Sequence, residues 1–167
     1  MKDDLPKPSR KLRTSKPERS KQSFHEMDLT GRTFKDFHLL RRLDRGGMAE
    51  VYLAKSVSTD HLRAVKVLRS DLAENTSYVQ RFHAEASAAT KLSHENIVET
   101  IAVGQLDNIH FIAQEYIDGI NLRQTLVKQR SLHWEHVIDI LKQIVAALGH
   151  AAEAGIVHRD IKPENIL

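Results

Sequence analysis

Short apolar runs separated by polar turns predict that the first half of the chain is rich in β-strands. The first three runs are separated by a glycine pair, Gly46 and Gly47, and by a polar turn at Thr59 and Asp60, a pattern that predicts an antiparallel meander. Two further runs are joined by a turn at Asp107-Asn108. The predicted strands are Phe37–Leu43, Val51–Ala54, Leu62–Leu68, Ile97–Val103 and Ile109–Tyr116.

Apolar residues at three- and four-residue steps predict a helix over residues 76–91 and a long helix over Trp134–Ala154. A shorter helix is expected at Leu122–Lys128, and Gly155 suits the end of the long helix because glycine readily adopts a left-handed conformation. Five strands and one helix followed by further helices indicate an α+β molecule with two lobes. The ligand is expected in the cleft between them.

Composition places the ordered part of the chain among soluble proteins. The 167 residues are 41% hydrophobic and 28% charged, enough apolar material for one domain with a core. The chain has no cysteine, which excludes disulfides and thiolate metal sites and fits a reducing compartment. No apolar run has the length of a membrane span, and the N-terminus lacks the apolar segment of a secretory signal. We therefore expect a cytoplasmic protein.

The net charge of +3 is concentrated at the N-terminus. Residues 1–32 contain nine Lys and Arg against five Asp and Glu, together with three prolines and few large apolar residues. Such a segment buries too little surface to offset its chain entropy, so we predict a disordered basic tail before an ordered domain at 33–167. A basic tail can bind nucleic acid or an anionic membrane surface. The absence of interleaved aromatic residues favours a solvated leader, and no nucleic-acid partner is expected.

The last residues of the chain carry the most specific motif. His158-Arg159-Asp160 is followed by Lys162 and Asn165, which matches the pattern H-R-D-x-K-x-x-N of the protein kinase catalytic loop. The competing interpretation is a surface turn with solvated charges. Four further kinase-like elements lie upstream in the expected order, which favours the catalytic loop.

From about Phe34 to Leu167 the chain resembles a bacterial serine/threonine protein kinase of the eukaryotic type. The resemblance implies a small lobe at 33–116 with a five-stranded antiparallel sheet and one helix, a hinge at 115–119, and the start of a helical large lobe at 120–167. It also implies transfer of the γ-phosphoryl group of ATP to a serine or threonine of a protein substrate, with ATP and Mg²⁺ as cofactors.

The segment Leu43–Val51 resembles the glycine-rich phosphate loop of this family. Gly46 matches the middle glycine, whereas Asp44 and Ala49 occupy the positions of the first and third glycines. Glycines serve there because the backbone approaches the phosphates closely. A carboxylate at position 44 is expected to weaken ATP binding if it points inward.

The resemblance assigns a role to each site residue. Lys66 would hold the α- and β-phosphates and be oriented by Glu85 on the following helix; the alternatives are an edge-strand lysine that reaches solvent and a solvated glutamate. Asp160 would accept the proton of the substrate hydroxyl, Lys162 would neutralise the transferred group, and Asn165 would hold Mg²⁺. The backbones of Glu115 and Ile117 would bond adenine. The implied ATP site comprises Leu43, Gly46, Gly47, Val51, Ala64, Lys66, Glu85, Glu115 and Ile117.

The magnesium-binding Asp-Phe-Gly motif of the family does not occur in the sequence. Three interpretations therefore stand: a kinase whose sequence is truncated, a nucleotide-binding remnant without phosphoryl transfer, and an interaction module with a basic tail. The intact catalytic loop favours the first. In each case we expect the long helix to expose apolar surface, which promotes association.

Overall fold

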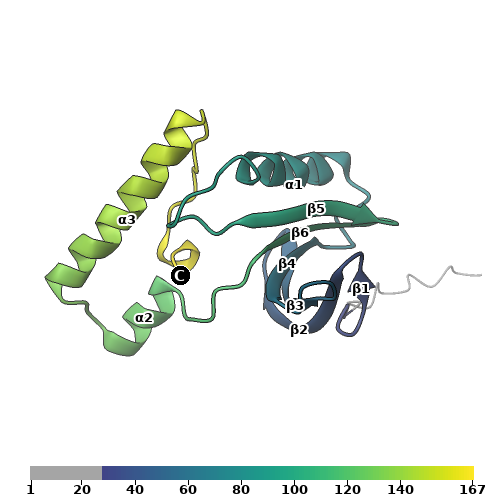
Figure 1. The fold of residues 1–167 in the computed structure, drawn as a ribbon, viewed down its shortest axis with the longest axis horizontal. Helices are drawn as coiled ribbons and strands as arrows, with labels where there is room; N and C mark the ends of the chain where they lie inside the picture. Colours follow the sequence, from purple (N-terminus) through teal and green to yellow (C-terminus); the bar gives the residue numbers. More distant parts are fainter. Residues whose placement is uncertain (1–27) are drawn as a thin grey trace, which may run out of the picture.

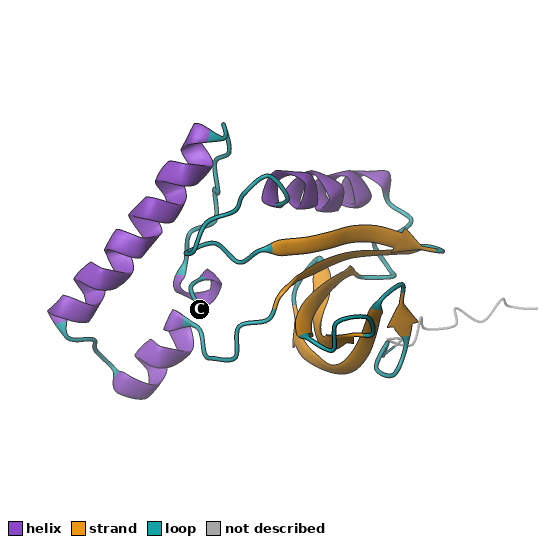
Figure 2. Ribbon diagram, viewed as in Figure 1, coloured by secondary structure: helices purple, strands orange, loops and turns teal. Residues whose placement is uncertain are grey.

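The computed structural model describes residues 28–167, and residues 1–27 of the predicted tail at 1–32 lie outside the described residues. A curved antiparallel sheet forms one part of the molecule, and α2 and α3 form the other (Figure 1 and Figure 2). The strands are β1 Thr33–Phe34, β2 Phe37–Arg45, β3 Ala49–Ser56, β4 Leu62–Leu68, β5 Thr100–Leu106 and β6 Ile109–Glu115, in the spatial order β1-β2-β3-β4-β6-β5. The helices of the described residues are α1 Thr76–Ala89, α2 Leu122–Gln129 and α3 Trp134–Glu153, followed by the short 3₁₀ helix η1, Pro163–Asn165.

Side chains alternate between the two faces of the sheet, and each face packs its own core. One face buries Tyr52 together with aromatic residues such as Phe34 and Phe111, whose rings stack with centroids 6.1 Å apart. The opposite face receives α1, which inserts the fully buried Phe82 and Ala86. The sheet is therefore the rigid element against which α1 is positioned.

Order begins earlier than the sequence predicted. Leu29 belongs to the buried core, and its N–H donates to the hydroxyl of Tyr52 at 3.3 Å. Gly31 adopts φ 82° and donates its N–H to the carbonyl of Leu39 at 2.7 Å. The prediction that the disordered tail extends to residue 32 is thus wrong for 28–32, because one leucine in a polar segment supplies an anchor that average composition does not reveal.

The strand predictions need two corrections. The two-residue strand β1 was not predicted, so the sheet has six strands instead of five. The strand expected to begin at Ile97 begins at Thr100. Residues before it form a turn in which the N–H of Ile97 donates to the carbonyl of His94 at 2.9 Å, and the His94 ring accepts the N–H of Asn96 at 3.0 Å. These local bonds use backbone groups that a strand would need for pairing.

The long helix α3 lies apart from the sheet (Figure 1). The turn before β5 meets it through a hydrogen bond from Asn96 to Gln143 at 3.2 Å and through the rings of His94 and His150, 5.3 Å apart. The expected apolar exposure on this helix is confirmed. The exposed apolar side chains are Trp134, Val137, Ile138, Leu141 and Val145. Among the described residues, no helix has the length and apolar character needed to cross a membrane.

Candidate active site

Lys66 and Glu85 form an ion pair between the sheet and α1. Lys66 lies on β4, directly opposite Val51 of β3 and Ile112 of β6. Because β4 lies between these two strands, Lys66 is not on an edge strand and that alternative is excluded. The packing of Phe82 on the sheet brings Glu85 to within 2.6 Å of the Lys66 ammonium (Nζ to Oε1). Glu85 is therefore paired with Lys66, although about half of its side chain (52%) remains exposed to solvent.

The turn between β2 and β3 occupies the position of the predicted phosphate loop. The N–H of Gly46 donates to the carbonyl of Ala49 at 2.8 Å, and a Cβ atom at Gly46 would lie 3.3 Å from that oxygen, a tight contact. Arg69 holds the tip: its N–H donates to the carbonyl of Met48 at 3.1 Å and its guanidinium donates to that of Gly47 at 3.3 Å. Backbone bonds thus define the shape of the loop.

Sequence reasoning missed the role of Arg69. It directly follows β4, and an isolated arginine after a strand matches no motif of the site. Its guanidinium is itself fixed by the carboxylate of Asp71 at 2.8 Å, and this partner holds the pKa of Arg69 above its ordinary value. The pair at Lys66 could be predicted by resemblance, whereas this second anchor required the three-dimensional structure.

Asp44 lies on the same face of the sheet as the candidate phosphate site. It is paired with Val51 in the β2–β3 ladder, and directly opposed residues in an antiparallel pair have side chains on the same face. Its carboxylate accepts the N–H of Arg45 at 2.8 Å. This bond keeps the Asp44 carboxylate beside the turn, so a negative charge remains close to the loop.

Three apolar residues of the predicted adenine site, Leu43, Val51 and Ala64, are only partly buried. Partial exposure of apolar side chains beside Lys66 leaves surface that a flat aromatic base can cover. In the hinge, the N–H of Glu115 donates to the carbonyl of Glu99 at 2.9 Å. Within residues 28–167, no backbone bond of turns and loops uses the N–H or carbonyl of Ile117, so both groups suit a ligand.

The predicted catalytic residues lie together after α3. The Asp160 carboxylate is 2.7 Å from the Lys162 ammonium, and the Asn165 amide nitrogen donates to the carbonyl of Asp160 at 2.8 Å and to its carboxylate at 3.2 Å. Arg159, immediately before Asp160, has φ 63°. A non-glycine residue in this left-handed region is strained, and such strain is concentrated at functional sites.

The charges of the predicted catalytic residues shift the pKa values of Asp160 and Lys162. The hydrogen bond from Lys162 is the main reason that the pKa of Asp160 lies below its ordinary value, and the bond from Asn165 acts in the same direction. The same pair raises the pKa of Lys162. At neutral pH the cluster therefore contains a carboxylate and an ammonium in contact, with an amide beside them.

Backbone contacts hold the catalytic loop against the start of the helical part. The N–H of Leu122, at the beginning of α2, donates to the carbonyl of Ile166 at 2.8 Å, and η1 lies beside α2 (Figure 1). Among the described residues, no hydrogen bond or ion pair links Asp160 to the Lys66–Glu85 pair. The two groups belong to different parts of the molecule, connected by the hinge.

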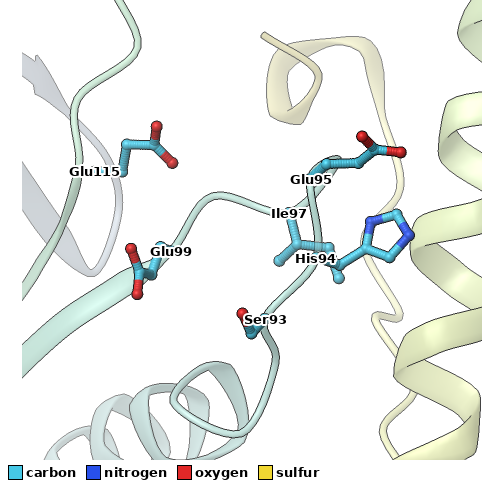
Figure 3. Close-up of a pocket in the computed structure, with 6 residues that line it drawn as sticks. All are labelled: Ser93, His94, Glu95, Ile97, Glu99 and Glu115. Carbon is cyan, nitrogen blue, oxygen red and sulfur yellow. The ribbon is translucent and has the colours of Figure 1, made fainter.

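A separate hollow of about 500 Å³ lies beside the hinge (Figure 3). Its lining residues are Ser93, His94, Glu95, Ile97, Glu99 and Glu115. Three of these residues have carboxylates, which repel phosphate groups. Glu115 alone belongs to both this lining and the predicted ATP site, so the hollow is distinct from the face that bears Lys66.

These elements occur in the order typical of a protein kinase, and residues 37–167 match the family model "Protein kinase domain". The chain belongs to the protein kinase family. It is 42% identical over 131 residues to the serine/threonine-protein kinase PrkC of Bacillus subtilis, an alignment that covers 78% of this chain and 20% of that protein. A probable serine/threonine-protein kinase PknB of Lactococcus lactis is 37% identical over 82% of this chain and 22% of its own length.

Solved structures agree with the kinase fold. The kinase domain of PknI from Mycobacterium tuberculosis superposes on 81% of this kinase chain with a TM-score of 0.71 and 32% identity, and 55% of that domain is covered. The chain spans about a fifth of the length of the curated kinases it matches. Its fold is that of a kinase small lobe followed by part of the helical lobe.

Proposed function

We propose that this chain supplies the ATP-binding lobe and the catalytic loop of a serine/threonine protein kinase. The observation that carries the proposal is the cluster of Asp160, Lys162 and Asn165, in which a carboxylate, an ammonium and an amide lie within hydrogen-bonding distance. We assign the small lobe to 28–116, the hinge to 115–119 and the start of the large lobe to 120–167. The boundary at residue 28 replaces that at 33 because Leu29 is in the core.

The ATP site lies on the face of the sheet that bears Lys66. Adenine contacts Leu43, Val51 and Ala64, and bonds the carbonyl of Glu115 and the backbone of Ile117. The phosphates lie under Gly46 and Gly47, and the Lys66 ammonium, fixed by Glu85 at 2.6 Å, bonds the α- and β-phosphates. The partly exposed apolar surface and the oriented ammonium support this placement.

Asp160 orients the substrate hydroxyl and accepts its proton. Its lowered pKa keeps it a carboxylate at neutral pH, as this role requires. Lys162 contacts the same carboxylate at 2.7 Å and is placed to neutralise charge on the transferred phosphoryl group. The lysine at this position of the loop matches the pattern of serine/threonine kinases. We therefore infer that the acceptor is a serine or threonine of a protein.

Asn165 can supply one ligand for Mg²⁺. The amide nitrogen of Asn165 is engaged with Asp160, which leaves its amide oxygen for a cation, and Mg²⁺ prefers oxygen ligands. When bound, Mg²⁺ neutralises the charge of the β- and γ-phosphates.

We further infer that the reaction takes place in the cytoplasm, since the chain has no cysteine that would indicate an oxidising compartment.

The experiment measures transfer of labelled γ-phosphate by the full-length protein that contains this chain, with itself and a generic protein as acceptors. We expect phosphoserine or phosphothreonine, and at least about a hundredfold loss in Asp160→Asn, because the general base contributes about 10²–10⁴-fold. The exposed Asp139→Asn on α3 is the matched control and should retain activity. A folded protein that binds ATP without transferring phosphate would establish the remnant interpretation instead, and equal activity in Asp160→Asn would remove Asp160 from this role.

A further inference from the structure

Glu50 is a buried carboxylate next to the phosphate loop, at a position for which the motif analysis gave no role. It directly follows Ala49, the first residue of β3, and only 8% of its surface is exposed. A carboxylate buried to this degree is costly unless it is paired and hydrogen-bonded. The contacts that keep it there therefore indicate what it does.

The Glu50 carboxylate is bound by three side chains. The Tyr52 hydroxyl donates to it at 2.6 Å, and the guanidinium groups of Arg42 and Arg45 each lie 3.5 Å from its Oε1 atom. Tyr52 is two residues along the same strand, so it shares a face with Glu50. Both arginines come from β2, so the carboxylate connects the two strands of the phosphate-loop hairpin.

A bulge in β2 makes this arrangement possible. Residues three apart on a regular strand face opposite sides of the sheet. In the β2–β3 ladder, however, Arg42 pairs with Tyr52 and Arg45 pairs with Glu50, and the register shifts between Arg42 and Asp44. Leu43 is the additional residue, and it turns both arginines towards the same carboxylate.

The hydrogen-bond network around Glu50 extends to Leu29, which lies N-terminal to the region that matches the kinase family model. The Tyr52 hydroxyl accepts the N–H of Leu29 at 3.3 Å while it donates to Glu50. Leu29 precedes residue 37, where the match to the kinase model begins. Leu29 is therefore connected to Glu50 of the hairpin by two consecutive hydrogen bonds through the Tyr52 hydroxyl.

We propose that Glu50 is a positioning residue for ATP: from the face opposite Lys66, it binds β2 to β3 and so holds the backbone of Gly46–Ala49 in the shape that receives the phosphates. The proposal rests on the proposed function. The loop is closed by the Gly46–Ala49 bond of 2.8 Å, and that bond forms only if the flanking strands keep their spacing. A preorganised loop avoids the ordering cost at the moment of binding.

This role has a distinctive consequence for ligand affinity. The turn at 46–49 contacts the phosphates, whereas the base contacts Leu43 and Val51 on the flanking strands, so loss of Glu50 should weaken the binding of ATP much more than that of adenosine. If Glu50 only stabilised the fold, its loss would weaken the binding of ATP and of adenosine by the same factor. If Glu50 acted only as a negative charge near the phosphates, its neutralisation would instead strengthen ATP binding.

The test is calorimetric titration of the chain with Mg-ATP and with adenosine. We expect Glu50→Gln to raise the ATP dissociation constant about fivefold to tenfold, the equivalent of one strong hydrogen bond, and to leave that of adenosine within about twofold. Tyr52→Phe, which preserves the buried ring, should act in the same direction with a smaller effect. Glu74→Gln removes the same charge from an exposed site and should change neither constant.

Unchanged or tighter ATP binding in Glu50→Gln, or equal loss for both ligands in the folded variant, overturns the proposal. If circular dichroism shows that Glu50→Gln is unfolded, Tyr52→Phe is judged by the same criteria. A wild-type chain that binds neither ligand contradicts the proposed function itself, and this failure is visible before any variant is compared.

Discussion

At the scale of single residues, their short spacing in the sequence was enough to predict that the candidate catalytic residues lie close together. Asp160, Lys162 and Asn165 lie within six positions of one another, and a local loop with one strained residue, Arg159, brings them into contact. Glu50 could not be found in this way. Its burial depends on Arg42 and Arg45, and their common orientation depends on a bulge that has no sequence signature.

The Asp160–Lys162 pair gives a prediction about pH. Lys162→Met should raise the pKa of Asp160 towards its ordinary value, because the principal cause of the lowering is removed. The pair is intact above the ordinary pKa of an aspartate and is lost as the pH falls through the lowered pKa, so the variant should protonate Asp160 at a higher pH than the wild type. NMR titration of the carboxyl carbon measures this shift.

Lys142→Met is the matched control for that titration. Lys142 is exposed on α3, and its ammonium lies 3.3 Å from Asp139 instead of Asp160. The pKa of Asp160 should therefore stay at its wild-type value in this variant. An Asp160 pKa that is the same in Lys162→Met and in the wild type would show that Lys162 does not interact with the carboxylate in solution.

At the scale of elements, periodicity predicted α1 well because its packing residues recur at helical spacing. Asn75 begins the helix by accepting the N–H of Ser77 at 3.0 Å, and Phe82 and Ala86 are fully buried. The strand at Ile97 was predicted too early because local bonds around His94 compete with pairing. Apolar pattern alone does not register such side-chain-to-backbone bonds.

The position of α1 should depend on Phe82. Phe82→Ala is expected to lower the free energy of unfolding by about 3–5 kcal/mol, as a large cavity in a core does, and to separate Glu85 from Lys66. Urea unfolding measures the first effect. Trp134→Ala removes an aromatic side chain that is 63% exposed on α3 and should change stability by less than about 0.5 kcal/mol. Equal losses in the two variants would contradict the packing described here.

At the scale of the whole molecule, the sequence predicted two parts joined by a hinge, and family resemblance identified both. It did not predict how they are held, because the contacts join distant residues. The bond from Leu122 to Ile166 fixes the catalytic loop to α2, and the pairs His94–His150 and Asn96–Gln143 fix α3 to the turn before β5. The sequence also failed to predict that order begins by Leu29, because the hydrogen-bond partner of Leu29, Tyr52, is 23 residues away.

If ATP binds on the face of the sheet that bears Lys66, loss of the Lys66 ammonium must weaken that binding, and calorimetric titration of the chain with Mg-ATP measures the effect. We predict that the wild type binds and that Lys66→Met weakens binding about tenfold or more, as expected for a lost charge-assisted hydrogen bond. Lys91→Met, at an exposed site after α1, should bind like the wild type. Binding of equal strength in Lys66→Met and the wild type would show that ATP does not bind at the Lys66 ammonium.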